Sequence, residues 1–192
     1  MKKCLSADLA SRIRRALKTR NIVFVGMMGS GKSAIGKRLA FNLDLDFIDA
    51  DQEIEEAANM SIPEMFETFG EEHFRDGERR VIERLMNGGP IVLSTGGGAF
   101  MNERTRELVA EKGVSIWLQA DFETLMERVR RKENRPLLKT ADPEATMRKL
   151  LAEREPVYAE ADITVASRNE SHETVVSAVA NTLWDYLDTH AA

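Results

Sequence analysis

The chain is poor in the residues that build disulfide frameworks and thiolate metal sites. Among its 192 residues there is a single cysteine, Cys4, and the three histidines are scattered along the sequence. One thiol cannot form an internal disulfide or a multi-cysteine metal centre, and its presence alone suits a reducing compartment. We therefore expect a cytoplasmic protein that uses no cysteine framework.

Two further absences restrict the partners. No apolar run approaches the roughly 20 residues needed to span a bilayer. The net charge of -5 and the isoelectric point near 5.4 argue against a nucleic-acid coat or an anionic membrane surface. We expect a monomer that binds small molecules, with neither nucleic acid nor membrane as a partner.

Residues 1–20 are basic and read as an extension ahead of one domain, 21–192. Their apolar residues are spaced by four, which indicates a short amphipathic helix rather than a secretory signal. A transit peptide is the less favoured alternative, because Asp8 interrupts the acid-poor segment. The spaced residues are Leu5, Leu9, Ile13 and Leu17.

From residue 21 onward, apolar runs alternate with helical patterns. This alternation predicts an α/β fold of three layers, with helices on both faces of a five-stranded parallel sheet. Two segments exceed what the crossovers need: a helical insertion at 61–86, divided at Gly70, and an irregular, lid-like stretch at 130–142. The predicted strands are Ile22–Val25, Asp46–Ile48, Ile91–Leu93, Val114–Leu118 and Ile163–Val165.

The run Gly26-Met27-Met28-Gly29-Ser30-Gly31-Lys32-Ser33 directly follows the first strand. Glycines let backbone N–H groups approach an anion, and the helix that follows favours negative charge at its start. Lys32 would contact the outer phosphates of a nucleotide, and the Ser33 hydroxyl could bind Mg²⁺. The sequence therefore predicts a nucleotide phosphate site at Gly29, Ser30, Gly31, Lys32, Ser33 and Ala34.

Acidic residues follow the second predicted strand, where ligands of open parallel sheets collect. If the strand persists, Asp49 and Asp51 point the same way. One could hold Mg²⁺ through water while the other takes a proton from a substrate hydroxyl, although Asp51 could instead cap the next helix. No acid follows the third strand, which shifts the metal role towards Asp49.

The third strand runs into Gly96, Gly97 and Gly98, which we interpret as an approach of ligand to bare backbone. The chain has no Asn-Lys-x-Asp guanine signature, which makes a GTPase switch unfavoured. Arginines supply the remaining candidates. Arg75 lies three residues before Glu78 and suits a substrate carboxylate, and the intervening Gly77 hints at a close approach.

A basic cluster at 128–135 precedes Pro136, so Arg135 could reach over the phosphates. Spacing alone does not distinguish a functional Arg154 from one that merely ends a helix.

Together these residues resemble the shikimate kinase family, and the resemblance runs from about Asn21 to Leu187. The motifs that carry it are Asp49-Ala50-Asp51, Phe74-Arg75 with Glu78, Gly96-Gly97-Gly98, Arg135-Pro136-Leu137-Leu138 and Arg154-Glu155-Pro156-Val157-Tyr158. The resemblance implies a fold like that of nucleoside monophosphate kinases, with 61–86 as substrate-binding region and 130–142 as lid. It also implies ATP as co-substrate with Mg²⁺, and phosphorylation of the 3-hydroxyl of shikimate.

On that likeness, Asp51 would hold the reacting hydroxyl, and Lys32 and Arg135 would stabilise the transferring phosphoryl group. Ser33 and Asp49 would bind Mg²⁺, and Arg128 would stack on adenine. Arg75, Arg154, Gly97 and Gly98 would bind the acceptor. The alternatives are another small-metabolite kinase, acting on gluconate or a nucleoside monophosphate, and a nucleotide-binding regulator without transfer activity.

Overall fold

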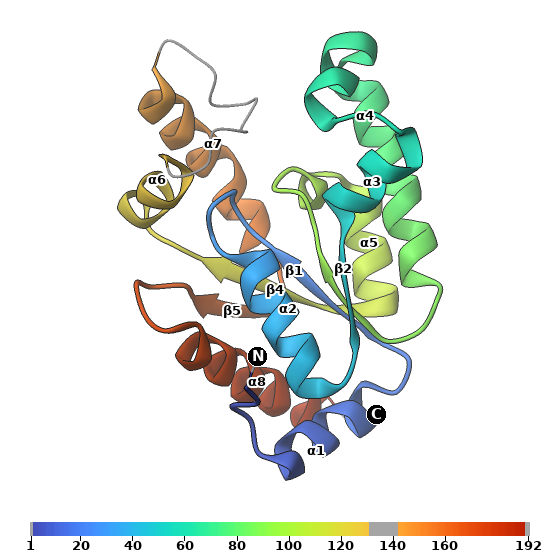
Figure 1. Cartoon of the computed structure of the whole chain (residues 1–192), viewed down its shortest axis with the longest axis vertical. Helices are drawn as coiled ribbons and strands as arrows, with labels where there is room; N and C mark the ends of the chain where they lie inside the picture. Colours follow the sequence, from blue (N-terminus) through green and yellow to red (C-terminus); the bar gives the residue numbers. More distant parts are fainter. Residues whose placement is uncertain (1, 131–141, 191–192) are drawn as a thin grey trace.

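The computed structural model describes residues 2–130 and 142–190 (Figure 1). Its strands are β1 (Asn21–Val25), β2 (Asp46–Asp49), β3 (Ile91–Ser94), β4 (Gly113–Gln119) and β5 (Ile163–Ala166). Its α-helices are α1 (Ala7–Leu17), α2 (Lys32–Leu43), α3 (Ala50–Ala58), α4 (Ile62–Met86), α5 (Glu103–Lys112), α6 (Phe122–Arg130), α7 (Pro143–Tyr158) and α8 (His172–Thr189). A short 3₁₀ helix, η1 (Ala99–Met101), follows the third strand.

The five strands form one parallel sheet in the order β2-β3-β1-β4-β5. Its register pairs Ser94 of β3 with Phe24 of β1 on one side and with Asp49 of β2 on the other, so the carboxyl ends of these three strands lie level with one another. The predicted fold class is confirmed, and every predicted strand is present with its bounds extended by at most one residue at each end.

Side chains of β1 alternate between the two faces of the sheet, as the pleat requires. Ile22 and Phe24 belong to a core shared with α1, α2 and α8. Val23 and Val25 belong to a second core formed with helices such as α4, α5, α6 and α7. Both faces are thus covered by helices, which is why the central strands are apolar on both sides. In the described residues, no helix combines the length and apolar character needed to cross a membrane.

Helix α1 is built into the first of these cores, packing on α2 and α8 (Figure 1). Ile13 and Leu17 are fully buried there, as the spacing of apolar residues by four predicts. Its approach is also fixed by Asn42 of α2, whose Oδ1 accepts the backbone N–H groups of Cys4 at 2.8 Å and Leu5 at 3.0 Å. The basic extension therefore shares the hydrophobic core of the domain that follows it.

Helix α4 begins with the predicted capping box, in which Ser61 and Glu64 each accept a hydrogen bond from the other's backbone N–H. Gly70 interrupts it with φ 79° and ψ 171°, a conformation open to glycine, so the insertion is two helical segments joined by a kink. A small apolar cluster that includes Ile54 of α3 and Phe74 of α4 joins the insertion to α3, the helix that follows the edge strand β2. Arg75, the next residue of α4, lies against Gly98 in the turn after β3.

Candidate active site

The loop between β1 and α2 is shaped to receive an anion. Gly26, Gly29 and Gly31 have φ values of 131°, 85° and 100°, in the left-handed region that glycine adopts without strain. Lys32 opens α2, and its Nζ folds back to donate to the carbonyl oxygens of Gly26 at 2.7 Å and Met27 at 3.0 Å. The lysine ammonium is therefore held over the loop at the amino end of a helix, where negative charge is favoured.

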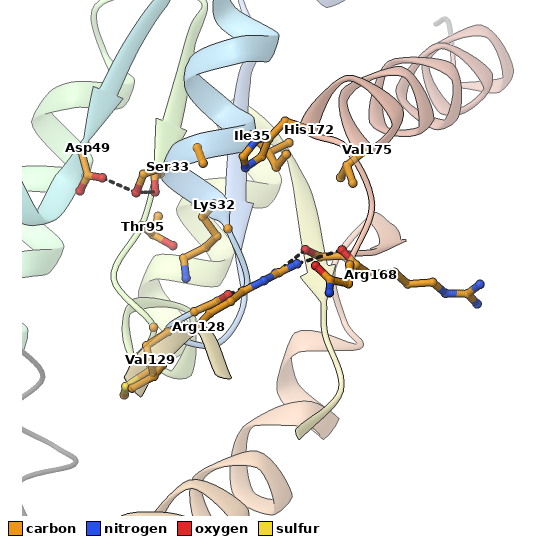
Figure 2. Close-up of a pocket in the computed structure, with 18 of the residues that line it drawn as sticks. Lys32, Ser33, Ile35, Asp49, Thr95, Arg128, Val129, Arg168, His172 and Val175 are labelled. Atoms are coloured by element: carbon orange, nitrogen blue, oxygen red, sulfur yellow. Dashed lines mark hydrogen bonds between the residues drawn. The ribbon is translucent and has the colours of Figure 1, made fainter. Parts of the chain in front are cut away.

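A cavity of about 490 Å³ extends from this loop across the carboxyl edge of the sheet. Five of the six predicted phosphate-site residues line it; Ser30 does not, because its side chain is completely buried. Figure 2 shows Asp49 and Ser33 at one end of this cavity and His172 and Val175 at the other. The structure therefore brings the cradle and the second-strand acid into one site.

The Ser33 hydroxyl donates to Oδ2 of Asp49 at 2.6 Å (Figure 2). The hydroxyl oxygens of Ser33 and Ser94 lie 3.2 Å apart. Asp49 and Ser94 are register partners on β2 and β3, which is why they meet here. These are hard oxygen donors beside the phosphate cradle, the set that Mg²⁺ uses together with substrate phosphates. Ser94 was not among the predicted site residues. It ends the third strand, where many nucleotide hydrolases carry a metal-binding acid, and that position could have identified it.

We expected Asp49 and Asp51 to point the same way if the second strand continued through both. It does not continue that far. β2 ends at Asp49, whose Oδ1 caps α3 by accepting the N–H of Asp51 at 3.1 Å. The cap is thus Asp49 rather than Asp51. Both side chains still line the cavity, because Asp51 lies in the first turn of α3.

Arg128 of α6 ties the cradle to the loop after β5. Its Nη1 donates to the Ser167 hydroxyl at 2.9 Å and to the Gly29 and Ser30 carbonyls at 3.3 Å, and its Nη2 donates to the Arg168 carbonyl at 2.8 Å. The Arg168 side chain itself points away from the cavity (Figure 2). Stacking of Arg128 on adenine stays a prediction.

The loop after β5 and the start of α8 contribute cavity residues that we did not predict. They follow β5, and we did not consider the residues after that strand in the sequence, although the rule that ligands collect at carboxyl ends applies to β5 equally. They are Ser167, Arg168, Asn169, Glu170, His172 and Val175.

Arg75 lies against the glycine turn after β3. A Cβ atom on Gly98 would collide with its guanidinium group. Its Nη1 donates to Oε2 of Glu78 at 2.7 Å, and its guanidinium carbon lies 5.2 Å from the centroid of the Phe74 ring. The predicted pairing with Glu78 is confirmed. The close approach expected at Gly77 is wrong, because a Cβ atom built there meets no described atom within 4 Å beyond its chain neighbours and its own helix backbone.

Two polar side chains near this turn are buried with an unsatisfied atom. Oε1 of Glu78 and Nη1 of Arg154 make no hydrogen bond to any described residue. Glu78 Oε1 and Asp51 Oδ1 both lie 2.7 Å from where a Gly96 Cβ would be, and Arg154 Nη1 lies 3.4 Å from the Gly97 position. Burial raises the pKa of Glu78, the Arg75 charge opposes that rise and the Asp51 charge adds to it. Buried polar atoms of this kind indicate a site that binds a polar ligand.

Arg135 and Pro136 lie outside the described residues, as does the part of the predicted lid from 131 to 141. All other predicted residues lie along one edge of the sheet. Gly29, Gly31, Lys32, Ser33, Ala34, Asp49, Asp51, Gly97 and Arg128 line the cavity, and Arg75, Gly98 and Arg154 gather around its glycine turn.

A strand, a glycine loop with its lysine and a helix, set in a parallel sheet with a helical insertion after β2, define a P-loop kinase. The family model described as shikimate kinase matches residues 28–184. The chain belongs to the shikimate kinase family, and it is an ATP-dependent kinase.

Particular relatives agree. The shikimate kinase of Bradyrhizobium diazoefficiens is 58% identical over 183 residues, covering 95% of this chain and 88% of the relative. That of Nitrobacter winogradskyi is 63% identical over 161 residues, covering 84% and 75%. Because 183 matched residues exceed the 172 that remain after residue 20, the first match includes part of the basic extension.

Among solved structures, the shikimate kinase from Acinetobacter baumannii in complex with shikimate superposes with a TM-score of 0.84 at 35% identity. The superposition covers 93% of this chain and 99% of that one. A gluconokinase from Sinorhizobium meliloti, at 17% identity and a TM-score of 0.58 over 90% of this chain and 94% of that one, shares the fold alone.

Proposed function

We propose that this protein transfers the γ-phosphoryl group of ATP to the 3-hydroxyl of shikimate, giving 3-phosphoshikimate and ADP. The observation that carries the proposal is the set of groups around the glycine turn. Arg75 and Arg154 supply guanidinium groups for a carboxylate, and Asp51 supplies an acceptor for a hydroxyl, next to a phosphate cradle. A small ring bearing one carboxylate and several hydroxyls matches this set.

For the acceptor, we assign the carboxylate to Arg75, Arg154 and the backbone of Gly97 and Gly98. The ion pair with Glu78 holds the Arg75 guanidinium in one orientation, which lowers the entropy lost on binding. Asp51 then receives the proton of the attacking hydroxyl.

For the donor, we assign the phosphates to the loop N–H groups and Lys32. We assign the adenine ring to Arg128. Ser33 would bind Mg²⁺ directly and Asp49 through water, since their oxygens already meet at 2.6 Å. Bound there, Mg²⁺ would neutralise charge on the phosphate oxygens. The role of Arg135 at the transferring group stays a prediction from the sequence.

Transfer follows from alignment. The substrate oxygen forms a bond to the γ-phosphorus as the bond to the bridging oxygen of ADP breaks, and the hydroxyl proton passes to Asp51. Little covalent help is needed, because orientation and charge neutralisation supply most of the acceleration in phosphoryl transfer. Lys32 moves from the loop carbonyls to the phosphates when the nucleotide binds.

The test is ADP release measured with shikimate, gluconate, a nucleoside monophosphate and no acceptor, each with and without Mg²⁺. We expect release only with shikimate and Mg²⁺. Release with gluconate or a nucleotide alone would reassign the acceptor, and binding of ATP without release for any acceptor would favour a regulator. We further propose that the protein is cytoplasmic. We also propose that it is a monomer, because one chain supplies all the assigned groups; light scattering checks the mass.

A further inference from the structure

Tyr158 is the last residue of α7 and is completely buried. Its ring packs against Trp117 of β4, with centroids 5.9 Å apart. It lies one helical turn after Arg154, so the two side chains leave α7 on the same side. The mechanism proposed above gives this tyrosine no role, yet it lies between both halves of the site.

The Tyr158 hydroxyl contacts one group from each half. It donates a hydrogen bond to the carbonyl oxygen of Gly97, in the turn assigned to the acceptor. It also lies 3.7 Å from the sulfur of Met27, in the loop assigned to the donor. A carbonyl is much the better acceptor, so the Gly97 bond is the one that constrains the turn.

This bond fixes more than one atom. The Gly97 carbonyl and the Gly98 N–H belong to one planar peptide unit, and the structure has no cis peptide among its described residues. In a trans unit the two groups point in opposite directions, so a carbonyl held towards Tyr158 directs the Gly98 N–H away from it. Between two glycines, rotation of that unit would otherwise meet little steric resistance.

Gly98 is the residue against which the Arg75 guanidinium lies, and Gly97 adjoins Nη1 of Arg154. The direction of this one peptide therefore decides whether its N–H joins the two arginines as a donor. We propose that Tyr158 is a positioning residue for the acceptor: its hydroxyl locks the Gly97–Gly98 peptide so that the Gly98 N–H is presented to the shikimate carboxylate. The inference rests on the proposed function, because it takes shikimate as the acceptor.

The hydroxyl is suited to a fixed donor role. Burial raises the pKa of Tyr158 to about 12, partly offset by the nearby Arg154 charge, so the proton stays on the oxygen at working pH. Phenylalanine at this position would fill the same space and leave the carbonyl without its donor. Because the Tyr158 ring packs against Trp117, the hydroxyl cannot follow the Gly97 carbonyl if the turn shifts.

The experiment is isothermal titration calorimetry of Tyr158→Phe and wild type, with shikimate and with MgADP in separate titrations. We expect the Kd for shikimate to rise about tenfold, the effect of losing one well-placed hydrogen bond to a charged group, while the Kd for MgADP changes less than twofold. Steady-state kinetics should show the same division, with a larger rise in the KM for shikimate than in the KM for ATP.

The matched control is Tyr186→Phe, the same change at the only other tyrosine of the chain. Its hydroxyl donates to Asp162 at 2.9 Å, remote from the cavity residues, so both Kd values should stay within twofold of wild type. A shikimate Kd that is unchanged in folded Tyr158→Phe overturns the inference. So does an equal loss for both ligands, which would indicate a general structural role.

If Tyr158→Phe does not fold, Trp117→Phe decides the question. It keeps the hydroxyl but loosens the ring that carries it, so the shikimate Kd should rise about two- to threefold with MgADP unaffected; no rise overturns the inference. The proposed function is tested separately by wild type alone. Wild type that phosphorylates shikimate while Tyr158→Phe binds it normally removes only the positioning role, whereas wild type that ignores shikimate removes both.

Discussion

Arg75 and Gly98 touch so closely that the glycine has no room for a side chain. A Cβ atom built on Gly98 would overlap the guanidinium group, although Arg75 belongs to α4 and Gly98 to the turn between β3 and η1. The arginine is also held by Glu78 at 2.7 Å, so it cannot move aside without breaking an ion pair. The acceptor turn and the helical insertion therefore fit each other only with glycine at 98.

Replacing Gly98 with alanine should thus weaken acceptor binding. We expect Gly98→Ala to raise the KM for shikimate at least tenfold by displacing Arg75, with the KM for ATP changed less than threefold. Steady-state kinetics with each substrate varied in turn measures this. Gly77→Ala, in open space on the same helix as Arg75, should leave both constants unchanged and stabilise the protein by about 0.5–1 kcal/mol.

Asp51 should separate chemistry from nucleotide binding. We expect Asp51→Asn to lower kcat by about 10²–10⁴, the usual contribution of a general base, because the amide cannot take the hydroxyl proton. The Kd for MgATP should stay within a few fold, since Asp51 is assigned to the acceptor. Rapid-quench assays and calorimetry measure the two quantities. Asp46→Asn, an exposed change at the start of β2, the strand that precedes α3, should affect neither; a parallel loss of MgATP binding in Asp51→Asn would refute the assignment.

The buried face of α1 should contribute stability and not catalysis. Ile13 is fully buried among α2, α8 and the sheet, so Ile13→Ala should cost about 2–4 kcal/mol. For a domain of this size that lowers Tm by about 5–15 °C. Differential scanning calorimetry measures the shift, with exposed Arg15→Ala as the control. A Tm within a degree of wild type would show that the extension is not part of the cooperative unit.

The fold was predictable because its signals are local. Apolar runs, the Ser61 cap and the break at Gly70 depend on neighbouring residues, and each is found where the sequence indicates it. The phosphate loop was predictable for the same reason, because its glycines and Lys32 form a contiguous motif whose backbone geometry follows from residue type.

Contacts between distant elements were not predictable in this way. Ser167 reaches the cradle because β5 pairs with β4, and its hydroxyl donates to the Ser30 carbonyl at 2.7 Å across 137 residues. The four hydrogen bonds of Arg128 and the bond from Tyr158 to Gly97 likewise depend on how helices pack on the finished sheet. Spacing along the chain carries no information about such contacts.

Glu78 offers a test in which stability and function should move in opposite directions. Its pKa is raised by burial, despite the Arg75 charge that lowers it, so the folded state holds a proton on Glu78 more tightly than the unfolded chain does. The stability from this group is present below its ordinary pKa of 4.5 and is lost as the pH rises through the raised value. Above that value, the buried charge opposes folding.

Glu78→Gln removes this charge while keeping the shape. We therefore expect the Tm of Glu78→Gln relative to wild type to become more favourable between pH 5 and pH 8, measured by thermal unfolding at each pH. At pH 7.5 the same variant should raise the KM for shikimate by about tenfold, because Arg75 loses the partner that orients it, while the KM for ATP stays within twofold. Glu83→Gln, which removes an exposed partner of Arg79 on the same helix, should show neither effect. A relative Tm that falls with rising pH would mean that the ion pair outweighs the cost of burying Glu78, and that the carboxylate is retained for stability rather than for holding Arg75.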